Sequence, residues 1–592
     1  MLVSPIGATY TPDSTTFRVW APNCRLVEVV LEGTGSFAMK GSRGGYHAAR
    51  IAGLSPGALY WFRLDGEGPF PDPASRFQPE GVHGPSMVVD PGQYEWKAEA
   101  FRGVSLDDLV LYELHVGAFT AEGTFRAAAD KLEYLRDLGI TAVELMPVAD
   151  FPGRWNWGYD GVAPFAPARC YGTPDELRAF VDRAHELGIG VLLDVVYNHF
   201  GPDGAYQGLF SRSYFSRRHR NAWGDGIHFD GRSSAPVREY FVQNALCWIR
   251  EYRLDGLRLD AVHAIHDDSR RHILAEIAGA LHRTEREVLV IAEDARNLAF
   301  LMQPETEGGW GLDAVWADDF HHQMRRALAG DSEGYFRHFD GSMAGIAKTA
   351  KLGWFRMGSD PRGLAYSRFL FCIQNHDQIG NRARGDRLHH SISAAAYRAA
   401  TTLLLLLPQT PLLFMGQEWA ASTPFLFFTD HHEELGKLVT EGRRREFQQF
   451  GSFAGEVPDP QSPATFQASQ LRWQELEQSP HAGTHRLYRD LLTLRRSHPA
   501  LRNPGYSPHL NIEACGSEAI LVRRGALLIA VALGGATEIA LPAGCGELVF
   551  STEQSAYAVD PLPPVYQAET NRLYFQRAGA AILEYGHAEE RP

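Results

Sequence analysis

The feature that most constrains the fold is a unit of amphipathic helix followed by a wholly apolar strand, which recurs through the middle of the chain. Residues 124–139, TFRAAADKLEYLRDLG, carry apolar side chains at helical spacing and end at a glycine, and ITAVELMPV follows. Residues 173–188 repeat the unit, with Thr173 as a helix N-cap and Pro174 in the first turn, before IGVLLDVVYNH. Helices that alternate with strands apolar on both faces predict a parallel sheet covered on both sides.

Six further candidate strands bring the total to about eight over roughly 400 residues, the number found in a TIM barrel. They are LVLYELHVG, DGLRLDAVHAI, EVLVIAEDARN, LDAVWADDF, RFLFCIQNHD and TPLLFMGQE. An open, doubly wound sheet would call for a glycine-rich phosphate turn after its first strand, and YELHVGAFT is not one. We therefore predict an α/β chain built around an enlarged (β/α)8 TIM barrel.

The two ends of the chain have a different sequence pattern, in which short apolar runs alternate with Gly, Pro and Asp residues typical of turns. Runs such as TFRVWAP and LYWFRLDG predict an N-terminal β-sandwich over residues 1–90. AILVRRGALLIAVAL and RLYFQRAGAAILEYG predict a C-terminal antiparallel β-domain over residues 505–592. The barrel with its loop insertions is then expected over residues 91–504.

Charge and apolar patterning exclude several kinds of partner. The chain has 57 basic and 71 acidic residues for a net charge of −14, whereas nucleic-acid binding depends on Lys and Arg that neutralise phosphates. The first residues lack the basic start and apolar core of a signal peptide, and TTLLLLLPQTPLLF is too short to span a bilayer. We expect a cytoplasmic protein with no nucleic-acid or membrane partner and a neutral, hydroxyl-rich ligand.

Acidic residues gather where the predicted strands end. Asp260, Glu293 and Asp377 follow three different strands, and in a TIM barrel those ends form one face that holds the active site. Converging carboxylates without lysine neighbours serve either a hard metal ion or glycoside chemistry. Aromatic residues that suit stacking on sugar rings also lie near these ends: Trp155, Trp157, Tyr159, Trp223, Trp316 and Phe320. A metal ion would not need them, so we favour sugar chemistry.

Four of these segments carry a family resemblance. DVVYNH, GLRLDAVHAI, IAEDARN and IQNHDQIGN resemble, in order and approximate spacing, the four motifs of the α-amylase family of glycoside hydrolases. WGYDGVAPFAP, WADDFHH and GQEWAASTPFLFFTDH narrow the resemblance to members that act on maltooligosyltrehalose. The likeness runs to about residue 500 and implies a glucan-binding-like N-terminal domain and no cofactor.

The resemblance implies a role for each acid. Asp260 matches the nucleophile that forms a covalent glycosyl-enzyme, Glu293 matches the acid/base, and Asp377 matches the carboxylate that holds hydroxyls of the reacting ring. Arg258 matches the arginine that pairs with the nucleophile, so Asp260 is expected to stay ionised while Glu293 starts protonated.

The same resemblance implies the residues that bind the substrate. Tyr159 is the expected stacking residue, His199 and His376 the hydroxyl-binding histidines, and Asp194 the brace for Arg258. The remaining candidates are His263 in the wall of the site and, on the leaving-group side, Asp318, Asp319, Phe320, His321 and Gln378. Trp419, at the end of the last strand, is a further candidate for lining a sugar subsite.

A structural metal is a separate question, because Asn198 matches a position that ligates calcium in many α-amylases. The segment after the third strand is short and poor in the extra acids that a shell of six to eight oxygens needs. We therefore expect no metal ligands.

The resemblance implies hydrolysis of the α-1,4 bond next to the terminal trehalose unit of maltooligosyltrehalose, and two alternatives stay open. A 1,4-α-glucan branching enzyme shares the barrel and the acids, but its members usually have a serine where Asn375 stands and an acid followed by serine after the third-motif glutamate. A non-catalytic glucan-binding barrel protein would usually have lost one of the three acids, and none is lost here. Oligomeric state is not constrained by these patterns.

Overall fold

The prediction of a (β/α)8 barrel is confirmed. The computed structural model describes residues 5–356, 358–361, 363–448, 457–502 and 510–586, and eight parallel strands in it close into a barrel. In order around the barrel they are β10 (Leu111–Leu114), β11 (Ala142–Leu145), β14 (Gly190–Val195), β17 (Gly256–Leu259), β18 (Leu289–Glu293), β19 (Ala314–Trp316), β20 (Phe369–Phe371) and β21 (Thr410–Phe414). Nearly all of their residues are buried, as expected for strands covered on both faces.

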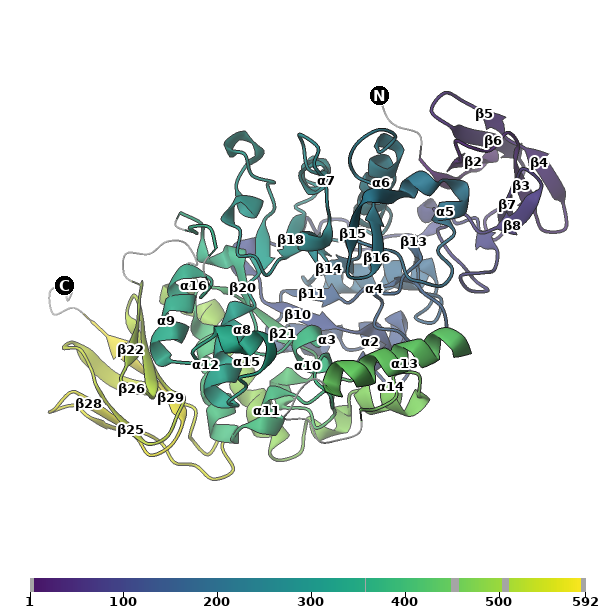
Figure 1. Ribbon diagram of the computed structural model, residues 1–592. Coiled ribbons are helices and arrows are strands. Elements are labelled where there is room, and N and C mark those ends of the chain that lie inside the picture. Colours follow the sequence, from purple (N-terminus) through teal and green to yellow (C-terminus); the bar gives the residue numbers. More distant parts are fainter. Residues whose placement is uncertain (1–4, 357, 362, 449–456, 503–509, 587–592) are drawn as a thin grey trace.

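Helices surround the strands (Figure 1). They include α3 (Leu132–Leu138), α4 (Pro174–Glu186), α6 (Ala235–Glu251), α7 (Ile273–Leu281), α8 (Asp319–Leu328), α9 (Met343–Leu352), α12 (Ala394–Leu406) and α15 (His481–Ser497). Helix α4 begins as its sequence predicts, because Thr173 and Glu176 form a reciprocal capping box and Pro174 follows the cap. None of the described helices combines the length and the apolar character needed to cross a membrane.

Two connections above the strand ends carry residues of the site. The β11–β14 connection contains a small hairpin of β12 (Ala149–Asp150) and β13 (Ala163–Pro167). The connection after β14 contains a second hairpin, β15 (Phe215–Asn221) and β16 (Gly224–Ile227). Both extend the rim of the barrel at the end where its strands finish.

The N-terminal part forms two antiparallel sheets around a core of its own. One sheet contains β1 (Gly7–Thr11), β2 (Ser14–Trp20), β6 (Tyr46–Ala52) and β5 (Lys40–Gly41). The other contains β4 (Gly35–Ala38), β3 (Val27–Leu31), β7 (Leu59–Leu64), β8 (Glu67–Phe70) and β9 (Ser86–Met87). Arg18 and Arg76 pair with Glu239 and Glu251 of α6, so charged contacts join this part to the barrel.

The C-terminal part is also antiparallel. One sheet has the order β22 (Leu510–Cys515), β23 (Ala519–Arg524), β24 (Leu527–Ala532), β29 (Gly579–Tyr585) and β26 (Cys545–Ser551). A second sheet contains β25 (Thr537–Ala540), β28 (Arg572–Phe575) and β27 (Val565–Gln567). Arg398 of α12 joins the barrel to the C-terminal part. Its Nε and Nη2 donate to the two carboxylate oxygens of Glu553 at 2.9 and 2.8 Å, and both side chains are buried.

Replacing Arg398 by methionine is expected to lower the free energy of unfolding by about 3 kcal/mol, because it removes one of the two arginines that pair with the buried Glu553 among the described residues and leaves Arg577. Urea denaturation measures the loss. The exposed pair Arg489–Asp490 supplies the control, since Arg489→Met should cost less than about 1 kcal/mol. Equal effects of the two substitutions would show that the buried pair does not stabilise the domain contact.

Candidate active site

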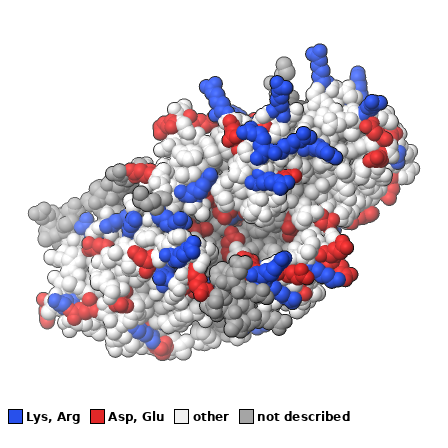
Figure 2. Space-filling view, viewed as in Figure 1, with Lys and Arg blue, Asp and Glu red and all other residues white. Residues whose placement is uncertain are grey.

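The structure brings the three predicted acids to one face of the barrel. Asp260 directly follows β17, Glu293 is the last residue of β18, and Asp377 lies in α10 (His376–Gly380) after β20. Their side chains are 10%, 20% and 33% exposed, so each reaches the surface while its backbone is held by the barrel. A hollow crosses the face seen in Figure 2; acidic side chains show inside it, and many Lys and Arg lie on the part above.

Arg258 is the centre of the site and is fully buried. Its Nη1 donates to Asp194 Oδ2 at 2.6 Å and to Asp260 Oδ1 at 2.9 Å, and its Nη2 lies 3.0 Å from Glu293 Oε2. A guanidinium presents several donors in a fixed plane, so one side chain can hold acids from three strands. The arginine was predicted to pair with Asp260 and to be braced by Asp194, and it also contacts Glu293. One cation therefore contacts both the predicted nucleophile and the predicted acid/base.

The backbone after Asp260 positions Glu293. Ala261 adopts a left-handed conformation with φ of 40°, and its N–H donates to Glu293 Oε2 at 2.7 Å. Such a conformation costs an ordinary residue about 1–2 kcal/mol and persists only where the surroundings impose it. This hydrogen bond links the ends of β17 and β18 and fixes the position of the Glu293 carboxylate relative to Asp260.

The other oxygen of Asp260 is held by Asn198. The Asn198 amide nitrogen donates to Asp260 Oδ2 at 2.7 Å, while its amide oxygen contacts His199 Nδ1. Both polar atoms of Asn198 therefore have protein partners. His199 Nε2 lies 3.0 Å from the Tyr159 carbonyl oxygen, and the ring of Trp223, which is 51% exposed, stacks on the His199 ring at 4.9 Å.

One cluster among the described residues brings three metal-binding side chains close together: His219, Asp230 and Asp268, beside the β15–β16 hairpin. Arg218 already pairs with both of its aspartates, and His219 Nε2 lies 3.0 Å from Asp230 Oδ2. These contacts make the cluster an ion-pair network, and it does not include Asn198.

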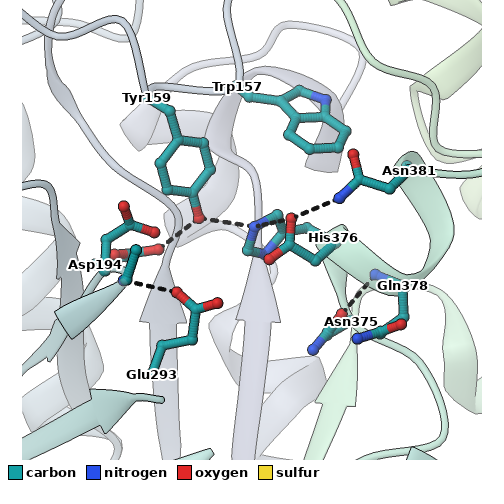
Figure 3. A network of polar contacts seen from close by, with 12 residues as sticks. Trp157, Tyr159, Asp194, Glu293, Asn375, His376, Gln378 and Asn381 are labelled. Atoms are coloured by element: carbon teal, nitrogen blue, oxygen red, sulfur yellow. Dashed lines mark hydrogen bonds and ion pairs between the residues drawn. The ribbon is translucent and has the colours of Figure 1, made fainter. Parts of the chain in front are cut away.

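A chain of hydrogen bonds runs from Asp194 through Tyr159 to His376 (Figure 3). Tyr159 Oη donates to Asp194 Oδ2 at 2.6 Å and lies 2.8 Å from His376 Nε2, and the two rings stack at 5.3 Å. Burial raises the pKa of Asp194 to about 7, although the Arg258 charge opposes the shift. His376 Nε2 is in turn 3.5 Å from Asp377 Oδ1, which also accepts a hydrogen bond from Asn381.

Sequence reasoning missed two buried acids inside the barrel. Glu113 of β10 contacts Nδ1 of His376, and Glu144 lies beside it in the register of β11. Both positions were read only as parts of apolar strands. An acid within such a run was the available signal, since a buried charge calls for a partner.

Asp318 and Gln378, which were predicted to lie on the leaving-group side, contact each other. Gln378 Nε2 donates to Asp318 Oδ2 at 3.4 Å, and Gln378 Oε1 accepts from Tyr335 at 3.1 Å. Burial and then the charges of Glu293 and Asp377 raise the pKa of Asp318 to about 7, so a proton is available there near neutral pH.

Several other predicted contacts lie elsewhere. Phe320 is fully buried against Phe371, with ring centroids 4.5 Å apart, and His321 is buried beside it. The stacking of Phe320 in the barrel core contradicts the prediction that it contacts the substrate, whereas the predicted contact of His321, which is as buried as His376, stays a prediction. Trp419 is also fully buried, so the prediction that it lines a subsite is wrong.

Asp319 and His263 differ in exposure, the first buried and the second exposed. The buried Asp319 carboxylate accepts from the backbone N–H groups of Phe355 and Arg356, each at 2.8 Å, and therefore braces a loop. His263 is exposed on the turn η4 (Val262–Ala264), two residues beyond Ala261.

The comparisons with known proteins agree with this geometry. Residues 92–226 match the α-amylase catalytic domain, and residues 5–91 match carbohydrate-binding module 48, the isoamylase N-terminal domain. A malto-oligosyltrehalose trehalohydrolase from Deinococcus radiodurans is 48% identical over 516 residues, which cover 84% of each chain. The Mycobacterium tuberculosis protein of that name is 40% identical over 92% of this chain and 98% of its own.

Further matches include solved structures and a more distant relative. A crystal structure from Salmonella typhimurium is 36% identical, with a TM-score of 0.89 over 99% of this chain and 100% of that one. A 1,4-α-glucan branching enzyme from Jannaschia is 28% identical over 84% of this chain and 70% of its own. A pullulanase from Anoxybacillus, 19% identical with a TM-score of 0.73 over 98% of this chain and 87% of that one, shares the fold.

Proposed function

We propose that this chain cleaves the α-1,4 bond next to the terminal trehalose unit of maltooligosyltrehalose. It belongs to the malto-oligosyltrehalose trehalohydrolase family of α-amylase-type glycoside hydrolases. The products are trehalose and a maltooligosaccharide. The observation that supports the proposal most is that Asp260 and Glu293 both contact the buried Arg258. The chain is also 48% identical to a malto-oligosyltrehalose trehalohydrolase.

The reaction that suits this geometry is a double displacement. An Asp260 oxygen attacks the anomeric carbon while Glu293 gives its proton to the departing glycosidic oxygen, so that a covalent glycosyl-enzyme forms and the trehalose end leaves. Glu293 then removes a proton from water, which attacks the same carbon and releases Asp260. Two inversions leave the α-configuration unchanged. Such enzymes hold the two carboxyl groups about 5–5.5 Å apart, which suits two acids on one guanidinium.

The remaining contacts position the sugar. Asp377 accepts hydroxyl hydrogen bonds of the reacting ring, whereas the ring nitrogens of His199 and His376 already have protein partners, so any hydroxyl contact of theirs shares those nitrogens. Tyr159 stacks under the ring and is fixed from below by Asp194. Asp318 and Gln378 contact the trehalose side, where the Asp318 carboxyl can donate as well as accept because it holds a proton near neutral pH.

Product analysis tests the proposal. The protein is incubated separately with maltooligosyltrehalose and with maltopentaose, and the sugars are identified by chromatography. We expect free trehalose from the first substrate and much slower cleavage of the second. Efficient cleavage of maltopentaose without release of trehalose would overturn the assignment. Iodine staining of amylose covers the branching-enzyme alternative, since branching shifts the colour without producing small sugars.

A further inference from the structure

Glu113 is a buried acid that the proposed reaction does not use directly. It is the third residue of β10 and lies inside the barrel wall. Its Oε2 accepts from the backbone N–H of His376 at 3.0 Å, and its Oε1 contacts the ring atom Nδ1 of the same residue. An ionised carboxylate is costly to bury unless it is paired, so both groups gain from a proton on Nδ1.

The opposite side of the His376 ring is also polar. Nε2 lies 2.8 Å from Tyr159 Oη and 3.5 Å from Asp377 Oδ1. Other charged or titratable groups near the ring are Asp194 and Arg258 on neighbouring strands, His115 after β10, and Glu144 of β11. Burial and Arg258 lower the pKa of His376, but the negative charges of Asp377 and Glu113 and the hydrogen bond to Glu113 raise it to about 9.

We propose that Glu113 is a positioning residue that keeps His376 protonated on both ring nitrogens, and that the imidazolium sets the direction of the hydrogen-bond chain through Tyr159 to Asp194. This inference rests on the proposed function only where it concerns turnover.

The geometry explains why the charge state matters. An imidazolium can only donate, so Nε2–H points to Tyr159 Oη, and the tyrosine must send its own proton to Asp194 Oδ2. If Nε2 lost its proton, it would accept from Tyr159 and compete with Asp194 for the same hydrogen. The charged ring also lies beside the Asp377 carboxylate, with Nε2 3.5 Å from its Oδ1.

The direct test is Glu113→Gln, which keeps the shape of the side chain and removes its charge. A glutamine can still accept from the His376 backbone N–H and donate to Nδ1, so the ring keeps its position but prefers the neutral form. We expect the pKa of His376 to fall by about 2 units. The loss of kcat/KM at alkaline pH should then begin at lower pH, because the ring loses its positive charge beside Asp377 there, while its remaining proton stays on Nε2 and keeps the hydrogen bond to Tyr159.

Two variants serve as controls. Glu144 is the register partner of Glu113 on β11, and it is equally buried. Burial and the Glu113 charge raise its pKa well above the usual range and so favour its uncharged form, and Glu144→Gln should leave the pH profile unchanged. Glu113→Asp keeps a carboxylate on a shorter side chain. The pKa of His376 in this variant should therefore be higher than in Glu113→Gln.

A readout that needs no substrate separates this inference from the proposed function. Nitrogen-15 NMR of labelled histidine rings, with the His376 signals assigned by their absence in His376→Asn, reports the charge on the ring without any substrate. In the unmodified protein both ring nitrogens should be protonated at pH 7.5. A neutral ring there, or a titration unchanged by Glu113→Gln, would overturn the proposal. A shifted titration in a protein that releases no trehalose would instead refute the proposed function.

Discussion

Replacing Asp260 by asparagine is expected to lower kcat on maltooligosyltrehalose by about 10⁴-fold or more, because the amide cannot displace the leaving sugar. The substitution is nearly isosteric and removes one of three acids around Arg258. The fold should therefore persist, and the substrate should still bind. Initial rates of trehalose release, together with calorimetric binding, measure the two effects.

Glu293→Gln should cause a loss of similar size with natural substrate, but for a different reason. It removes the proton donor, which a fluoride leaving group does not need, so a maltooligosyl fluoride should restore the first step in Glu293→Gln but not in Asp260→Asn. Glu307→Gln, at an exposed site on the same connection after β18, is the matched control and should turn over normally. Undiminished trehalose release by Asp260→Asn would show that Asp260 is not the nucleophile.

Replacing Arg258 by methionine is expected to lower the free energy of unfolding by about 3–5 kcal/mol and to abolish turnover. The substitution leaves Asp194, Asp260 and Glu293 close together without their shared cation, and uncompensated buried charge is among the most costly defects in a protein. Urea denaturation of the variant and the unmodified protein measures the difference.

The cost of losing Arg258 should depend on pH in a defined direction. Asp194 has a folded pKa of about 7, above its ordinary value, so its ionisation reduces stability as the pH rises from about 4 toward 7. Removing Arg258 raises that pKa further, and the destabilisation should therefore be larger at pH 8 than at pH 5. Arg271→Met breaks an exposed pair with Glu305 and should cost less than about 1 kcal/mol at pH 8. A loss as small in Arg258→Met would contradict the central role of this arginine.

The amino-acid sequence by itself determined the barrel and the meeting of the three acids. The alternation of helical and fully apolar segments encodes which faces must be buried, and strand ends of a parallel barrel necessarily lie on one face. The Thr173 cap and the placement of Asp260, Glu293 and Asp377 follow from such local rules.

Only the tertiary structure decided which side chains of those segments face the site and what charge they carry. Phe320 and Trp419 belong to promising motifs but are packed in the core, whereas Glu113 lies in an apolar strand and reaches His376. Glu113 and Glu144 are adjacent acids in similar strands, yet only Glu113 has a cationic partner. The reason is physical. Whether an acid holds a proton depends on its burial and on its distance to charges on other strands, and the sequence of one strand fixes neither the burial nor those distances.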